Sequence, residues 1–246
     1  MGDDLVVLVL SDIHGNFHAL KEVLNKAAKY KWKELWFLGD MGGYGPRPEE
    51  CFQLLKQKNS VFIPGNHDLY LSGQLSGSSF SEEARRSLIT NRGLVKKSTV
   101  EVLKDLPLKQ TRKGITLVHG SPENPAFDYI LNETDAIRNF SAFKGSCCLF
   151  GHSHVQEYFK LTQDELDWQR PENGTIINFK KSRILINPGS IGQPRDRDPR
   201  AAWGLLDTRK KEMTFFRTDY DITATQREMQ KIGSSEFLIQ RLSQGI

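Results

Sequence analysis

Cysteines and long apolar runs are both scarce in this sequence. Its 246 residues include three cysteines, Cys51, Cys147 and Cys148. They are too few, and two of them too close together, for a disulfide framework, so we expect buried thiols in a reducing cytoplasm. The longest apolar runs fall far short of the roughly 20 residues of a membrane-spanning helix. The acidic start, MGDD, argues against a signal peptide, and we expect no membrane partner.

An excess of one charge is also missing. The formal net charge is +4, from 34 basic and 30 acidic residues, and no Lys/Arg cluster resembles a nucleic-acid-binding stripe. We therefore expect no nucleic-acid partner, while the oligomeric state stays open. Internal repeats and Pro/Ser-rich linkers are absent too, which favours a single domain over residues 1–246.

One pattern recurs five times: a short apolar run that ends in Asp, Asn or His beside glycine. Such runs are typical of strands covered on both faces. If the strands share one sheet direction, their polar turns converge on one edge, where α/β sheets bind ligands. The predicted strands are residues 5–10, 35–38, 61–63, 115–118 and 147–150.

The segments between and after these runs suggest the rest of the fold. Residues 17–31 and a segment beginning at Pro48 read as helices, giving the βαβ order of a parallel sheet. Residues 69–112 are predicted to be a helical insertion without a strand, either a cover for the sheet edge or a lid. Its helices are placed at residues 81–91 and from a capping box at residues 98–101.

Past His154 the pattern predicts strands without helices between them, forming a second sheet. They are residues 155–160, 175–180, 183–187, 201–206 and 212–217, with a loop at 163–173 and helices from Ile222.

The residues that end the five runs offer oxygen and imidazole ligands but no thiolate. This donor set suits Mn²⁺, Fe, Zn²⁺ or Co²⁺ rather than a structural cysteine zinc site. Seven ligands indicate two ions, and Asp40 is the natural bridge because its two oxygens can each take one metal. Two such ions can activate water and clamp a displacement at phosphorus. The candidate ligands are Asp12, His14, Asp40, Asn66, His119, His152 and His154.

The order Asp-x-His, Gly-Asp, Gly-Asn-His-Asp, His-Gly, Gly-His-x-His resembles the calcineurin-like metallophosphoesterases, and Asn187-Pro-Gly-Ser resembles a loop of their small bacterial and archaeal members. The resemblance implies an α/β fold, a four-layer α/β/β/α sandwich of two mixed sheets flanked by helices. It also implies two divalent ions, Mn, Fe or Zn, with Mn²⁺ the best candidate in vitro.

The resemblance further implies a role for each site residue. Asp12, His14 and His154 would hold one metal with Asp40. Asp40 would share the other with three more ligands, Asn66, His119 and His152. His67 would be no ligand but would contact the substrate oxygen opposite the attacking hydroxide, so His67 and Asp40 are the catalytic candidates.

The predicted function is a dinuclear phosphoesterase that hydrolyses small phosphomonoesters, phosphodiesters or (di)nucleotide polyphosphates by metal-activated hydroxide attack. The alternatives are a phosphoprotein (Ser/Thr) phosphatase and a scaffold without catalysis. Candidate substrate-binding residues are Asn16, Tyr44, Arg195 and Arg197. The loop at residues 187–200 is predicted to return to the edge of the first sheet; alternatively, its arginines pair with Asp196, Asp198 and Asp207 on the surface.

Overall fold

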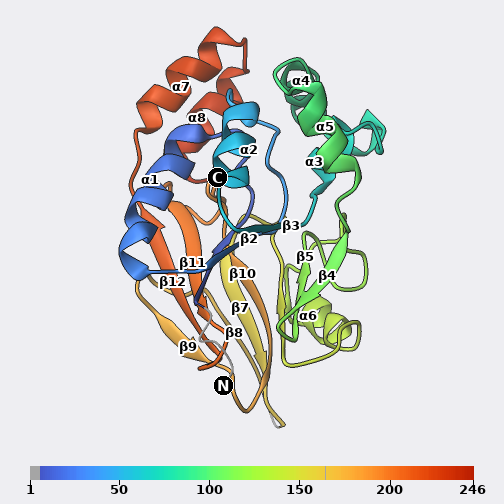
Figure 1. The fold of residues 1–246 in the computed structure, drawn as a ribbon, viewed down its shortest axis with the longest axis vertical. Helices are drawn as coiled ribbons and strands as arrows, with labels where there is room; N and C mark the ends of the chain where they lie inside the picture. The colour runs from blue at the N-terminus through green and yellow to red at the C-terminus, as the bar shows by residue number, and fades with distance from the viewer. Residues whose placement is uncertain (1–5, 164) are drawn as a thin grey trace.

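The computed structural model describes residues 6–163 and 165–246, and it consists of two six-stranded sheets packed face to face (Figure 1). In the first sheet, β1, β2 and β3 are parallel, and the other three strands are antiparallel to their neighbours. Its strand order is β3 (Ser60–Phe62), β2 (Glu34–Phe37), β1 (Val6–Leu10), β11 (Ala201–Asp207), β12 (Glu212–Thr218) and β9 (Ile176–Asn178).

The second sheet is also mixed. Here β5, β6 and β10 are parallel, and β4, β7 and β8 pair antiparallel with their neighbours. Its strand order is β4 (Lys109–Arg112), β5 (Ile115–Val118), β6 (Cys147–Leu149), β10 (Arg183–Pro188), β7 (Gln156–Leu161) and β8 (Leu166–Gln169).

The side chains of β1 show why its sequence is apolar at every position. Val7 and Val9 belong to the core between the two sheets, whereas Leu8 and Leu10 belong to the core under the flanking helices. All four are fully buried. Because successive residues of a strand point to opposite faces, a strand between two cores has no polar face.

Helices cover both outer faces of the two sheets. Against the first sheet lie α1 (Phe17–Ala27), capped by Asn16, and α2 (Pro48–Lys56), which has a proline in its first turn. Against the second lies α6 (Glu133–Phe140). The predicted α/β/β/α sandwich is therefore confirmed. The other helical elements are η1 (Ala28–Tyr30), α3 (Asn66–Leu71), η2 (Gly77–Ser79), α4 (Glu82–Arg92), α5 (Lys97–Lys104), α7 (Ile222–Lys231) and α8 (Glu236–Gln244).

The predicted division of strands between the sheets was wrong. The five early strands do not share one sheet, because β5 and β6 join β10 in the second. Conversely, β9, β11 and β12 do not join a second sheet but extend the first, where β11 pairs with β1. Strand partners this far apart in the chain leave no mark on the local hydrophobic pattern.

Other differences are local. A strand, β4, ends the expected strandless insertion, and β8 lies within the expected loop at residues 163–173. Both are four-residue edge strands: β4 has no apolar residue, and β8 has only Leu166 and Trp168, so neither has the apolar run of a buried strand. The capping box at residues 98–101 is also wrong, because α5 begins at Lys97 after Lys96. Leu5 lies outside the described residues.

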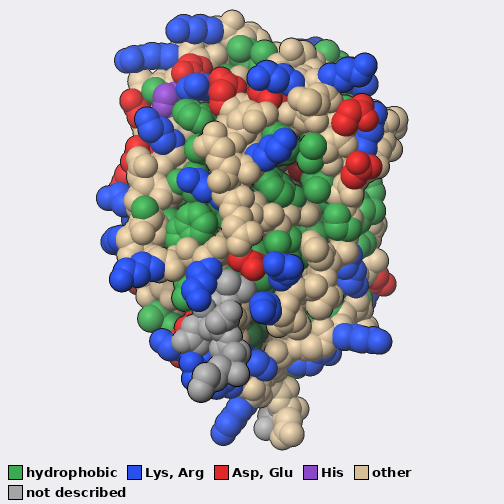
Figure 2. Space-filling view, viewed as in Figure 1, with side chains coloured by type: hydrophobic (Ala, Val, Ile, Leu, Met, Phe, Trp, Pro, Cys, Tyr) green, Lys and Arg blue, Asp and Glu red, His purple; other side chains and the backbone are tan. Residues whose placement is uncertain are grey.

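Two features of the surface bear on partners. No helix within the described part of the chain is long and apolar enough to cross a membrane. On the face seen in Figure 2, basic side chains are spread over the whole surface and alternate with acidic ones near its upper, helical end.

Candidate metal centre

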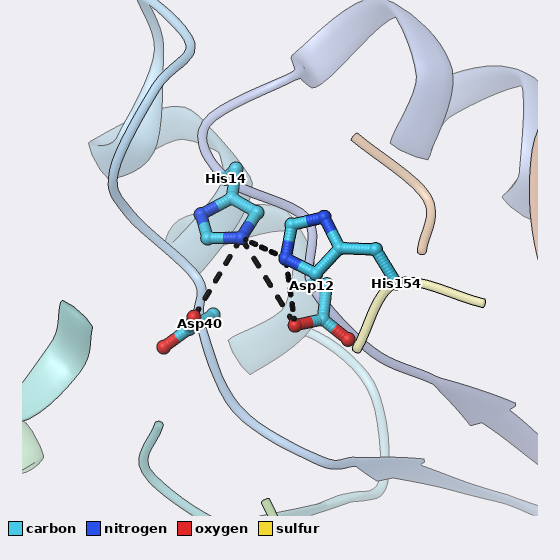
Figure 3. Close-up of side chains that lie close together, drawn as sticks. All are labelled: Asp12, His14, Asp40 and His154. Atoms are coloured by element: carbon cyan, nitrogen blue, oxygen red, sulfur yellow. Dashed lines mark hydrogen bonds and ion pairs between the residues drawn. The ribbon is translucent and has the colours of Figure 1, made fainter. Parts of the chain in front are cut away.

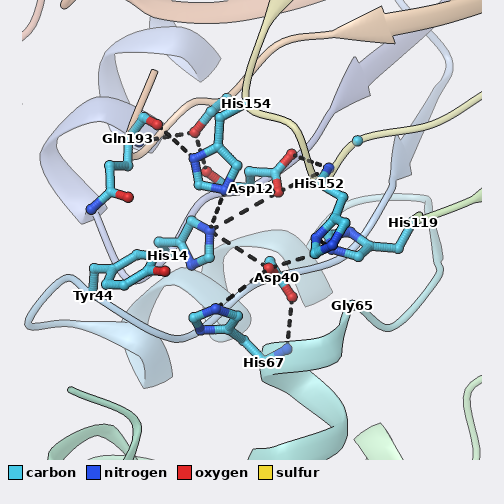
Figure 4. Close-up of polar contacts among 12 residues, drawn as sticks. Asp12, His14, Asp40, Tyr44, Gly65, His67, His119, His152, His154 and Gln193 are labelled. Atoms are coloured by element: carbon cyan, nitrogen blue, oxygen red, sulfur yellow. Dashed lines mark hydrogen bonds and ion pairs between the residues drawn. The ribbon is translucent and has the colours of Figure 1, made fainter. Parts of the chain in front are cut away.

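Five loops meet at one end of the sandwich and bring the predicted ligands together (Figure 4). Asp12 and His14 follow β1, Asp40 follows β2, and Asn66 begins α3 after β3. His119 follows β5, and the pair at residues 152 and 154 follows β6. The predicted ligands thus converge, although their loops follow the carboxyl ends of strands that belong to two different sheets. Of the six histidines, five lie here, and His18 pairs with Glu228 elsewhere.

The first group of ligands consists of Asp12, His14, Asp40 and His154 (Figure 3). Their ligand atoms all lie within 4.8 Å of one another, and all four residues are buried. His14 Nε2 lies 3.6 Å from Asp40 Oδ2, and His154 Nε2 lies 3.4 Å from Asp12 Oδ1. This is the spacing of side chains that surround one cation.

The second group consists of Asp40, His119 and His152. His119 Nε2 lies 3.4 Å from Asp40 Oδ2 and 3.2 Å from His152 Nδ1. Asn66 follows on the adjacent loop, and its buried Oδ1 accepts no hydrogen bond from any residue that the structure describes, so this oxygen can serve a cation. Asp40 belongs to both groups, which is the position of a bridging carboxylate.

The four candidate ligand imidazoles are each oriented by a hydrogen bond from the ring nitrogen that points away from the site to a backbone carbonyl. His14 Nδ1 donates to the Gly42 carbonyl at 3.0 Å, and His119 Nδ1 donates to Leu38 at 2.7 Å. His152 Nε2 donates to Phe127 at 3.1 Å, and His154 Nδ1 donates to Gln193 at 2.6 Å. A carbonyl oxygen can only accept, so the outer nitrogen of each ring carries the proton. Metal-ligating histidines are held in this way, through the nitrogen that is not bound to metal.

This arrangement forces two nitrogen lone pairs to face each other. His14 Nε2 and His154 Nε2 are 3.0 Å apart, and both lack a proton when the rings are neutral. Burial, reinforced by His67 at one ring and by Arg195 at the other, holds the pKa of each well below its usual value. A pair of opposed lone pairs beside two carboxylates is repulsive by itself and favourable around a cation. The first group therefore fits a divalent metal ion.

In the second group, the Asp40 carboxylate favours a proton on His119. Burial alone would lower the pKa of His119, but Asp40 raises it to about 9. Likewise, burial alone would raise the pKa of Asp40, but His119 and His67 hold it well below its usual value. Burial lowers the pKa of His152 to about 3 and that of His67 to about 4. A cation that binds here must displace the His119 proton.

The backbone at the ligands is strained. Among the described residues, nine non-glycine residues have positive φ, and five of them are Asp12, His14, Asp40, His152 and His154, at 48° to 65°. This left-handed region is unfavourable for residues with a Cβ, and such strain concentrates at functional sites. The left-handed backbone makes tight turns, so that two ligand residues of one loop, such as Asp12 and His14, point into the same site.

Glycines beside the ligands allow the loops to approach. A Cβ on Gly65 would overlap Asp40 Oδ1, and a Cβ on Gly151 would overlap Ser11 Oγ. Any side chain at either position would push apart two loops that carry ligands. This explains why Asn66 and His152 each follow a glycine.

Comparison with known proteins identifies the family to which the chain belongs. Residues 5–156 match the model of the family described as "Calcineurin-like phosphoesterase". A protein of Methanocaldococcus jannaschii, itself uncharacterized, is 30% identical over 246 residues, 98% of each chain. The chain belongs to the calcineurin-like phosphoesterase family. It is, accordingly, a metal-dependent phosphoester hydrolase.

Solved structures agree with this family assignment. A metallophosphoesterase from Sphaerobacter thermophilus is 36% identical and superposes with a TM-score of 0.90, covering 99% of this chain and 100% of that one. A hypothetical protein from Pyrococcus horikoshii OT3, 22% identical, has the same fold with a TM-score of 0.80, covering 98% and 99% of the two chains.

A pocket of about 270 Å³ opens onto the candidate metal ligands of this phosphoesterase. Tyr44 and Arg195, two predicted substrate-binding residues, line it. The Arg195 guanidinium donates to Gln193 Oε1 at 2.9 Å and to the Tyr44 hydroxyl at 3.4 Å. The remaining lining residues are Asp40, Asn66, His67, Ser79, Phe80, Ser81, Ala84, Tyr129, His152, His154 and Arg241.

The structure does not bring the other two candidates, Asn16 and Arg197, into this pocket. Asn16 is buried, where its side chain caps α1 and donates to the Gly192 carbonyl, so its polar atoms are already used. Arg197 is exposed, because the backbone turns through positive φ there and its N–H donates to Gly245.

The Asn-Pro-Gly-Ser loop returns to the first sheet as predicted. Ile191 N donates to the Ser11 carbonyl, and Gly192 N donates to that of Asp12. Asn187 at its start donates to Gly151, in the loop that carries His152. The loop therefore ties the carboxyl edges of the two sheets together. The alternative prediction, that an arginine of this loop pairs with an aspartate instead of lining the pocket, holds for Arg200, which pairs with Asp198.

Asp68 is a positioning residue that the sequence analysis left without a role. Its buried carboxylate accepts hydrogen bonds from the backbone N–H groups of Asp40, Met41 and Gly65, at 2.8 to 3.1 Å. Burial raises its pKa to about 7, and Asp40 adds to this shift. The signal was present, since this aspartate directly follows His67 in the motif.

Other pocket residues left no local signal in the sequence. Phe80 and Ala84 come from the insertion, which supplies one wall of the pocket. Tyr129 stacks on the His152 ring at 3.9 Å, and Arg241 comes from α8 near the end of the chain. Only tertiary packing brings these residues to the site.

We expect Asp40→Asn and Asp12→Asn to affect metal binding differently. Asp12 serves only the first group, so Asp12→Asn should leave one of about two tight Mn²⁺ equivalents. Asp40→Asn should weaken both. Isothermal titration calorimetry and elemental analysis measure this, and identical stoichiometry in the two variants would contradict the shared position of Asp40.

Asp68→Asn should loosen the two loops without removing a ligand. An amide has one acceptor oxygen where the carboxylate has two, so one or more backbone N–H groups lose their partner. We expect Mn²⁺ affinity to fall about 10- to 100-fold and unfolding free energy to fall by about 1–3 kcal/mol. Asp105→Asn, exposed at the end of α5, is the control. Wild-type metal affinity in Asp68→Asn would contradict this role.

Proposed function

We propose that this enzyme hydrolyses small phosphate esters at two divalent cations held by the loops described above. The observation that carries the proposal is the pair of buried, opposed nitrogens of His14 and His154 beside Asp12 and Asp40, an arrangement that favours a cation. The chain keeps every predicted ligand, which weighs against a scaffold that has lost catalysis.

The two ligand groups have separate duties in this proposal. Asp12, His14 and His154 hold one cation with Asp40. The other cation is held by Asp40 together with Asn66, His119 and His152. Two divalent cations there would neutralise the anionic ester and make water a stronger nucleophile near neutral pH. Mn²⁺ is the metal we propose for reconstitution in vitro.

His67 contacts substrate rather than metal in this proposal. Its Nε2 lies 4.0 Å from Asp40 Oδ2, and its buried Nδ1 has no hydrogen-bond partner among the described residues. The rings of Tyr44 and Phe80 hold the imidazole in place, with centroids at 5.0 and 5.2 Å. A ring that lines the pocket with an unused nitrogen can donate to a phosphate or leaving-group oxygen.

Arg195 lines the pocket, where it is placed to bind a phosphate group of the substrate. Its guanidinium lies over the Tyr44 ring, 5.8 Å from the ring centroid. Contacts with Tyr44 and Gln193 leave the buried Nε without a hydrogen-bond partner in the described part of the chain. A guanidinium held in this way can donate to a nonbridging phosphate oxygen.

The substrate class is the finer part of the proposal. A local stretch of 70 residues, 27% of this chain and 25% of the relative, is 34% identical to a symmetrical bis(5'-nucleosyl)-tetraphosphatase of Psychromonas ingrahamii. This supports including nucleotide polyphosphates beside simple mono- and diesters. A screen of Mn²⁺-loaded protein against nitrophenyl mono- and diesters, nucleotides and diadenosine polyphosphates tests the class. Hydrolysis of none of them would contradict the proposed function.

His67→Ala should lower kcat by about 10²- to 10⁴-fold for an ester with a poor leaving group. Metal content should stay at the wild-type value, because His67 is not a ligand. His18→Ala on α1 is the matched control, since that histidine lies outside the pocket. Unchanged kcat in His67→Ala, or a loss explained by missing metal, would overturn the assignment.

Arg195→Ala and Arg197→Ala should differ although both remove an arginine from one loop. Arg195→Ala should raise KM about tenfold or more, the effect of losing a charged hydrogen bond. Arg197→Ala should leave KM near the wild-type value, because this side chain is exposed and outside the pocket. Steady-state kinetics on one good substrate from the screen measures the KM of both variants. Equal changes in KM would refute the assignment of Arg195, and not Arg197, to substrate binding.

A further inference from the structure

The pocket that opens onto the candidate metal ligands is also lined by two arginines from distant parts of the chain. Arg195 comes from the loop after β10, and Arg241 comes from α8. Neither forms an ion pair with an aspartate or glutamate of the described residues. The metal centre explains neither position, since arginine does not bind cations.

The fold holds Arg241 in place beside the site. Leu238, Ile239 and Leu242 of α8 belong to the same apolar cluster as Tyr44 and Ala84, which line the pocket. The Arg241 guanidinium lies over the Phe237 ring, 5.2 Å from its centroid, and Nε donates to a carboxyl oxygen of Ile246, the last residue of the sequence. These contacts fix one side of the guanidinium, and its terminal nitrogens have no protein partner among the described residues.

The end of α8 is tied to the loop that carries Arg195. Arg197 N donates to the Gly245 carbonyl at 2.8 Å. Gly245 has a φ of 66°, and a Cβ there would press on the backbone of residues 197 and 198. In Figure 1 the carboxyl terminus likewise lies beside the helical end of the sandwich. The two arginines are therefore set relative to each other by backbone contacts.

Electrostatics support the same reading. Burial lowers the pKa of Arg241 to about 10, and the charge of Arg195 adds to this shift. Two positively charged guanidinium groups in one pocket repel each other unless an anion lies between them. The pocket's carboxylate, Asp40, is already surrounded by imidazoles.

We propose that Arg195 and Arg241 form a subsite for a second phosphate group of the substrate. This rests on the proposed function, in which the first phosphate lies at the metal ligands. The two cations of the proposed function would neutralise that phosphate, so a further pair of forked donors suits an additional one. The preferred substrates are therefore small molecules with at least two phosphates, such as nucleotide polyphosphates, rather than simple monoesters.

The test compares the binding of two stable probes to the Mn²⁺-loaded protein. Methylphosphonate carries one phosphonate, and methylenediphosphonate carries two. Isothermal titration calorimetry at a fixed excess of free Mn²⁺ gives the ratio of their dissociation constants. Wild type should prefer methylenediphosphonate at least about tenfold, the effect of an added charged hydrogen bond.

Arg241→Gln and Arg241→Met keep the side-chain stem over Phe237 but remove the charge. Both should reduce the preference for methylenediphosphonate to about threefold or less while leaving methylphosphonate affinity unchanged. Arg227→Gln, exposed on α7, is the control and should behave as wild type. Thermal unfolding of each variant verifies folding, and either variant alone suffices for the test.

The outcomes separate this subsite from the proposed function. A wild-type protein without preference for the second phosphonate, or Arg241 variants with wild-type preference, would overturn the subsite. A protein that hydrolyses no ester would contradict the proposed function, while the calorimetric preference would still decide the subsite.

Discussion

The structure depends on one constraint: buried imidazole nitrogens must be held close together around Asp40 and Asp12. His14 and His154 face each other at 3.0 Å, and His119 and His152 at 3.2 Å. Such groups repel or compete for protons unless a cation lies among them. Each ring is therefore locked by a hydrogen bond from its outer nitrogen to a backbone carbonyl.

Holding these groups costs conformational energy, and the sandwich supplies the stability. Five ligands have left-handed backbone, each at a cost of roughly 1–3 kcal/mol. The loops that carry them are short connections from strands buried between cores on both faces, so they have little freedom to relax. Asp68 and the loop after β10 then bind neighbouring ligand loops to one another.

The residues that gather at the candidate metal centre could be predicted from the sequence, because each one lies next to the strand that positions it. A strand, a glycine and a ligand form a local pattern, and five repeats of it sufficed. Membership of the two sheets could not be predicted, because β11 pairs with β1 across nearly 200 residues of chain. The edge strand β4 has no apolar residue, and the apolar/polar alternation of β8 extends over only four residues.

Residues that shape the pocket were harder to find for the same reason. Arg241 looks like any surface arginine of an amphipathic helix, and only the packing of α8 beside Tyr44 brings it to the site. Arg195 and Arg197 are equivalent in sequence, but the backbone turn at Arg197 sends that side chain outward. Pocket specificity thus depends on tertiary contacts, whereas ligation depends on local motifs.

The most direct test of the metal centre is anomalous X-ray diffraction from a crystal soaked in Mn²⁺. The account predicts two peaks: one among Asp12, His14, Asp40 and His154, and one among Asp40, Asn66, His119 and His152. Asp40 should contact both. A single peak, or peaks away from these residues, would contradict it.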